Sequence, residues 1–166
     1  MNKNRNVAIL ADTWYINHTL VGEDVTVTLP SIEWLTQSIK AGGNIDIPLY
    51  GLTDALDTNV TNDGEFVAEA VKPGTQQHEF RWVKTVVNKT TGDTEEIGCK
   101  AFLKLQSKNI PEIGIEPQEA GESSYDFSTL RYQLYENGVE KFLYDKLTGD
   151  LRINSKDYGN KLKQYL

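Results

Sequence analysis

The chain has only one cysteine among its 166 residues, Cys99. A single cysteine excludes an intrachain disulfide and a cluster of thiolate metal ligands. Cys99 is in phase with Ile97, Ala101 and Leu103, so we expect a small, buried packing residue. The one apolar run near the N-terminus, residues 7–11, is too short for a signal peptide or a membrane span. We therefore expect a protein that folds in the cytoplasm and has no membrane anchor.

Basic residues are also in short supply. The chain has 17 lysines and arginines against 24 acidic residues, a formal net charge of −7. Tight binding to a nucleic-acid backbone needs clustered lysines and arginines. The composition therefore argues against a protein that grips nucleic acid, although it suits one that must avoid sticking to it.

Groups suited to catalysis are sparse. The only two histidines, His18 and His78, are isolated from each other and from any obvious nucleophile. Residues 54–59 are rich in oxygen ligands but lack the glycine and terminal glutamate of a calcium loop. No glycine-rich phosphate loop occurs. Adjacent carboxylate pairs arise by chance among 24 acids. We expect no catalytic residue, no metal site and no cofactor.

What the sequence does contain is alternation of apolar and polar residues, the period of half-buried strands. About seven such strands are recognisable, which predicts a single mainly β domain over residues 1–166. Residues 88–93 and the Asn137-Gly138 pair each separate two alternating segments. Asparagine and glycine tolerate the positive φ of tight turns, so both positions predict hairpins.

Residues 25–52 form the most ordered segment. Two alternating strands flank a Leu-Pro stop, an amphipathic connector and the Ala41-Gly42-Gly43 sequence. Residues 31–40 fit either a short helix or an extended arm. Residues 64–71 and 155–166 are candidates for short helices. Residues 107–124 contain four glutamates and no periodicity, and a loop of that length indicates a functional or partner-ordered segment.

Taken together, these segments resemble the major tail tube protein of contractile-tailed phages and of R-type bacteriocins. The resemblance lies in residues 25–43, residues 45–52, two long central strands joined at residues 91–93, and residues 130–162. It covers most of the chain in the expected order. The chain departs from the family pattern at residues 58–77, where the family commonly has a fuller helix.

The resemblance implies a β-sandwich or half-open barrel with one or two short helices. Six copies would form a ring in which inner strands join into one shared barrel, and stacked rings would form a hollow tube inside the contractile sheath. Other partners would be the tail sheath protein, the baseplate or initiator proteins and the tail terminator. The particle would be a virion tail or a tail-like bacteriocin, assembled in the bacterial cytoplasm.

The same resemblance suggests roles for particular residues. The strands within residues 25–52 would form the inner sheet, with apolar faces toward the core and polar faces toward a lumen through which DNA passes without specific binding. The lumen-facing candidates are Asp24, Thr26, Thr28 and Asp46. The candidates for contacts between subunits are Ile32, Trp34, Leu35, Ile39, Gly42, Gly43, Ile110, Ile113 and Ile115.

Two other functions fit a β scaffold. The chain is rich in tryptophan and tyrosine, which are enriched at protein interfaces and could also form a carbohydrate-binding platform. A soluble carbohydrate-binding β-sandwich is therefore the main alternative, and an acid/base hydrolase built on carboxylate pairs is the third. Stacked rings in electron micrographs would favour the tube, and glycan binding or turnover would favour the others.

Overall fold

The computed structural model describes residues 4–159 and confirms a mainly β fold. The described residues contain one short 3-10 helix, η1 (Ala68–Val71). The strands are β1 (Asn4–Ile16), β2 (Thr19–Glu23), β3 (Thr26–Thr28), β4 (Trp34–Lys40), β5 (Asn44–Thr53), β6 (Leu56–Asn62), β7 (Thr75–Asn88), β8 (Thr94–Ser107), β9 (Ser123–Glu136), β10 (Val139–Asp145), β11 (Leu151–Ile153) and β12 (Lys156–Asp157).

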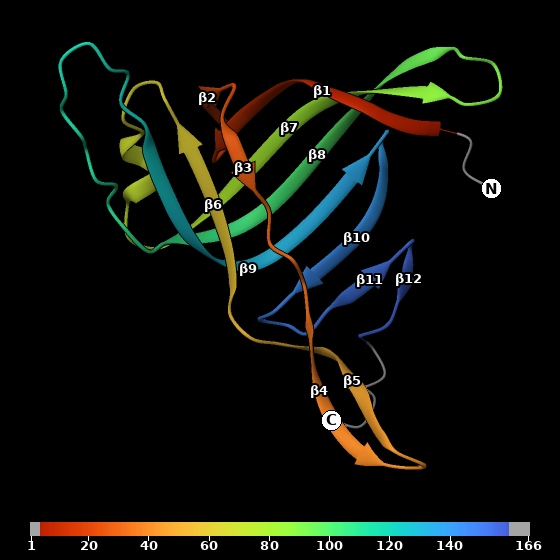
Figure 1. Cartoon of the computed structure of the whole chain (residues 1–166). Helices are drawn as coiled ribbons and strands as arrows, with labels where there is room; N and C mark the ends of the chain where they lie inside the picture. Colours follow the sequence, from red (N-terminus) through yellow and green to blue (C-terminus); the bar gives the residue numbers. More distant parts are fainter. Residues whose placement is uncertain (1–3, 160–166) are drawn as a thin grey trace.

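Ten strands belong to one strongly curved antiparallel sheet (Figure 1). Its main path is β12-β11-β10-β9-β8-β7-β1-β2. One edge of β9 is shared, because β10 pairs with Arg131–Glu136 and β6 pairs with Ser123–Thr129. β3 then pairs with β6. The sheet thereby folds back at β9, so that β3 and β6 lie opposite β7 and β8 (Figure 1).

The two predicted hairpins are confirmed. Residues 88–93 join β7 to β8, and the Asn88 side chain accepts hydrogen bonds from the backbone N–H groups of Thr90 and Thr91. Asn137 and Gly138, at φ +53° and +75°, join β9 to β10. In both turns, residues that tolerate a tight reversal stand where the strands must reverse.

The core centres on Trp14 of β1, which is fully buried. Its indole ring lies 5.5 Å from the ring of Tyr125 and 6.2 Å from that of Phe80, measured between centroids. The predicted inward face of β8 is also confirmed, since Cys99, Ala101, Leu103 and Leu105 are all buried. Large aromatic side chains thus fill the space between the two halves of the curved sheet.

The prediction that the strands of residues 25–52 form one sheet is wrong within the single chain. The apolar face of the first strand does meet the core, where Val25 is buried and Val27 packs against it, but that of the second strand does not. β3 belongs to the large sheet, whereas β4 and β5 form a separate two-stranded sheet. Ile45, Ile47 and Leu49 of β5 remain exposed. The tight turn at residues 41–43 makes β4 the nearest partner of β5, and the pair extends away from the body (Figure 1).

The helical segments also differ from expectation. Of the two conformations considered for residues 31–40, the structure has the extended one. Only the end of the 64–71 segment is helical, as η1. At the start of the 155–166 segment, Asn154 and Ser155 adopt φ of +51° and +67°, so the chain reverses and β12 pairs with β11. Residues 160–166 of that predicted helix lie outside the described residues.

Acid should destabilise the fold through His78, a buried histidine beside Trp14. The indole N–H donates to His78 Nδ1 at 3.0 Å, so that nitrogen carries no proton, and the buried Nε2 atom has no hydrogen-bond partner within residues 4–159. Burial lowers the pKa of His78 from 6.5 to about 4. Between these values the unfolded chain binds a proton that the folded chain excludes, so stability is lost as pH falls. The expected loss is about 3 kcal/mol between pH 7 and pH 4.

Urea unfolding at several pH values measures this loss directly. His78→Gln serves as the matched control, because glutamine offers an acceptor to Trp14 but does not titrate. The variant should lose less stability than the parent over the same interval. Equal pH dependence in the two proteins would contradict the assignment to His78.

Candidate functional site

The hairpin formed by β4 and β5, which we call the arm, extends from the curved sheet (Figure 1). Its register places Leu35, Ile39, Ile45, Ile47 and Leu49 on one face. The opposite face carries Thr36, Ser38, Lys40, Asn44 and Asp46. The five apolar side chains are between 37% and 45% exposed. The arm is therefore amphipathic but has no core of its own chain on its apolar side.

The tip of the arm is a turn at Ala41-Gly42-Gly43. Gly42 and Gly43 have φ of +66° and +127°, which side chains with a Cβ rarely adopt. The Ala41 N–H donates to the Gly43 carbonyl at 2.8 Å and closes the turn. The two glycines predicted to act between subunits therefore have a local role, since they allow the tight reversal that keeps β4 and β5 paired.

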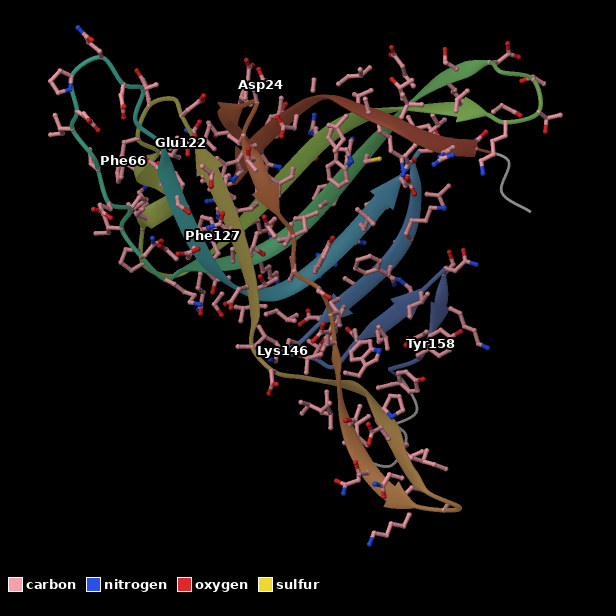
Figure 2. The ribbon with its side chains drawn as sticks, in the orientation of Figure 1. Asp24, Phe66, Glu122, Phe127, Lys146 and Tyr158 are labelled. Carbon is pink, nitrogen blue, oxygen red and sulfur yellow. The ribbon has the colours of Figure 1, made fainter. Side chains whose placement is uncertain are left out.

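The base of the arm is held against the curved sheet. Trp34 packs on Tyr144, with 5.3 Å between ring centroids, and the Tyr144 hydroxyl donates to the Gly51 carbonyl at 2.8 Å. Lys146 Nζ donates to the Asp54 carbonyl at 2.7 Å, and Figure 2 shows Lys146 beside this base. Ile32 packs into the same cluster. Ile32 and Trp34 thus anchor the arm within the chain, whereas Leu35 and Ile39 lie farther out.

The arm leaves two strand edges and an apolar face without a cover from the described chain. An isolated two-stranded hairpin is only marginally stable in water. Among the described residues β4 and β5 pair only with each other, so each presents one unpaired edge. Unpaired edges beside exposed apolar side chains are surfaces on which other chains add. The arm is accordingly the strongest candidate for a binding surface in this structure.

A second candidate surface is the loop between β8 and β9. Its ends are joined by Asn109, which accepts from the Asp126 N–H at 2.8 Å and donates to the Ser124 carbonyl at 3.1 Å. Between these clamps Ile110, Ile113 and Ile115 are exposed, Ile115 at 93%. Because the three isoleucines are exposed to solvent and the ends of the loop are joined, these side chains are better suited to a contact with another molecule than to packing within the chain.

The lumen-facing candidates lie on two separate surfaces. Asp24, Thr26 and Thr28 are exposed at and beside β3, within the large sheet. Asp46 lies on the polar face of the arm, where its carboxylate accepts from the Ser38 hydroxyl at 2.5 Å. One chain therefore does not bring these four residues together on a common face.

Sequence reasoning missed an exposed apolar patch on the first half of β1. Val7, Ile9 and Leu10 are all more than half exposed. The pairing of β1 with β7 skips Val7 and Leu10, which marks two β-bulges. Because each bulge inserts one residue, the alternation of the strand is broken and a period of two is not visible in the sequence. The only feature of the sequence that could have indicated this patch is the presence of three large apolar residues within a short segment.

The described residues offer little to a catalytic or metal-binding function. They contain no group of three or more histidine, cysteine, aspartate or glutamate residues that could hold a metal ion. His18 is exposed, whereas His78 is buried in the aromatic core. Several of the aromatic residues that suggested a carbohydrate platform, among them Trp14, Tyr125 and Tyr144, are also buried. No described helix has the length and hydropathy needed to cross a membrane.

The family model described as phage tail tube protein FII matches residues 8–166. The matched region includes the curved sheet, the arm and the clamped loop. No curated protein matches the chain.

Proposed function

Because this chain belongs to the family of phage tail tube protein FII, we propose that its copies form hexameric rings that stack into the inner tube of a contractile tail. Tubes of this kind belong to the virion tail. The feature of the structure that best supports the proposal is the arm, whose apolar face and two free edges need a cover that the described chain does not supply.

The charge of the chain suits a conduit for DNA or ions. Six copies, each with a formal charge of −7, would give a ring 6 × −7 = −42 charges. DNA phosphates are repelled by an acidic wall, so DNA would slide through it without being held. For the lining we propose the exposed residues Asp24, Thr26 and Thr28 at and beside β3 and Asp46 on the polar face of the arm.

The remaining partners follow from the position of a tube within a tail. The sheath protein would surround the outer wall. Baseplate or initiator proteins would begin the first ring, and a terminator would end the last one. Assembly would take place in the bacterial cytoplasm. The clamped loop between β8 and β9 is our candidate for contacts outside the arm, because Ile113 and Ile115 extend into solvent.

Electron microscopy of the purified protein tests the proposal. We expect rings with six-fold symmetry and stacks of such rings, formed either spontaneously or after addition of the baseplate initiator. Sedimentation would show the same change as a concentration-dependent shift from monomer to large assemblies. A protein that stays monomeric with and without the initiator would contradict it.

A further inference from the structure

A groove of about 400 Å³ lies between the segment that joins β3 to β4 and the strands β10 and β11 (Figure 1). Ile32 and Trp34 line it from the first side, and Phe142, Leu151 and Ile153 line it from the second. Phe142 pairs with Ile153 in the register of β10 and β11, and Leu151 lies two residues before Ile153 on the same face. The groove therefore opens onto the apolar face of this part of the sheet.

This apolar surface is only partly covered by residues 4–159. Leu151 is buried, whereas Ile153 is 44% exposed and Ile32, Trp34 and Phe142 have intermediate exposure. The one charged side chain in the lining is the exposed Lys141. Removing hydrocarbon of this kind from water is favourable, so the groove suits an apolar segment.

The chain leaves the described residues beside this groove. The N–H groups of Tyr158 and Gly159 donate to the Leu151 carbonyl at 2.7 Å and 3.3 Å. Gly159 is buried, and a Cβ at this position would lie 2.6 Å from the Gly149 carbonyl oxygen and 2.9 Å from the Leu151 nitrogen. The close approach of Gly159 thus holds the chain against Leu151, a residue of the groove lining.

Residues 160–166 have the composition that such a groove requires. Their sequence is Asn-Lys-Leu-Lys-Gln-Tyr-Leu, with Leu162, Tyr165 and Leu166 as large apolar residues and no acidic residue. Seven residues reach at most about 25 Å from their point of origin. Because that point lies next to Leu151, the groove is within reach of the segment.

We propose that residues 160–166 dock in this groove of their own chain, with Leu162 and Tyr165 against its apolar walls. The lysines of the segment remain in solvent, because ammonium groups resist burial. Ile32 and Trp34 belong to the base of the arm, so the docked segment ties that base to β11. It thereby restrains the direction of the arm relative to the large sheet. The contact belongs to the single chain and does not depend on tube assembly.

Thiol labelling tests whether the segment covers the groove. Ile153→Cys in a Cys99→Ala background places a reactive thiol on the groove wall. Adding Leu162→Asp and Tyr165→Asp should raise its rate of reaction with a maleimide about tenfold, because aspartate resists burial against apolar walls. The measurement uses dilute protein that sediments as a monomer.

The matched control adds the same charge to the same segment without removing an apolar side chain. Asn160→Asp combined with Gln164→Asp should leave the labelling rate at position 153 unchanged. A second thiol site reports on the fold as a whole. Val139→Cys replaces a residue on β10 that is 52% exposed and does not line the groove, so its labelling rate should be the same in every variant.

Three outcomes would overturn the docking. The first is an Ile153→Cys thiol that reacts equally fast with and without the two aspartates at positions 162 and 165. The second is an equal rise at positions 139 and 153, which would indicate a loss of the fold and no local cover. The third is protection that appears only at high protein concentration, because another copy would then cover the groove. Since the assay uses the monomer, none of these outcomes bears on the proposed tube.

Discussion

Replacing Ile39, Ile45 and Ile47 by aspartate should abolish tube assembly and leave the monomer folded. These side chains lie on the apolar face of the arm and are 41% to 45% exposed in the single chain. Their loss therefore costs the monomer little. At an interface between copies, each aspartate removes apolar contact and introduces a charge that resists burial. The concentration needed for assembly should rise about a hundredfold or more.

The matched control uses the opposite face of the same hairpin. Thr36→Asp and Asn44→Asp add charge at equal distance along the arm but on its polar side. We expect these variants to assemble with much smaller defects. Circular dichroism and thermal unfolding verify that all variants remain folded, and sedimentation with electron microscopy measures assembly. Normal tubes from the triple aspartate variant would show that the apolar face of the arm is not an interface.

The sequence predicted those parts of the fold in which local chemistry and tertiary structure agree. Asn137-Gly138 and residues 88–93 formed the expected hairpins, because their positive-φ or side-chain-capped turns do not depend on distant contacts. The buried face of β8 followed from alternation around Cys99. The resemblance to tail tube proteins, built on such segments, was confirmed by the family match.

The arm shows where alternation stops being informative. A strand with Ile45, Ile47 and Leu49 on one face reads the same whether that face meets the core of its own chain or the surface of another copy. Periodicity reports that a face is apolar, and it says nothing about what covers it. The prediction that this face lies in the core of its own chain failed for that reason. Leu35 and Ile39 on the same face are also exposed, and their contact with another subunit stays a prediction.

The patch on β1 was missed for a different reason. Two bulges, at Val7 and Leu10, break the period of the strand, and bulges depend on the pairing with β7 some 70 residues away in sequence. Structural features that depend on pairing between strands far apart in the sequence cannot be predicted from the periodicity of a short segment.

The curvature of the sheet makes Trp14 the residue on which the monomer depends most. Trp14 is fully buried and contacts four rings from two other strands, those of His78 and Phe80 on β7 and of Tyr125 and Phe127 on β9. Trp14→Ala should lower the free energy of unfolding by about 3–5 kcal/mol, because the surrounding rings are held by the sheet and cannot collapse into the cavity.

Trp14→Phe separates the packing of the indole from its hydrogen bond. Phenylalanine keeps most of the ring contacts but leaves His78 Nδ1 without the donor that now lies 3.0 Å away, an omission that costs about 1–3 kcal/mol for a buried acceptor. Urea unfolding followed by circular dichroism should therefore rank the stabilities as parent, Trp14→Phe and Trp14→Ala. The phenylalanine variant should also show a raised pKa of His78, because Nδ1 is then free to take a proton. Equal stability of the alanine and phenylalanine variants would contradict the claim that an aromatic ring at position 14 stabilises the core by filling it.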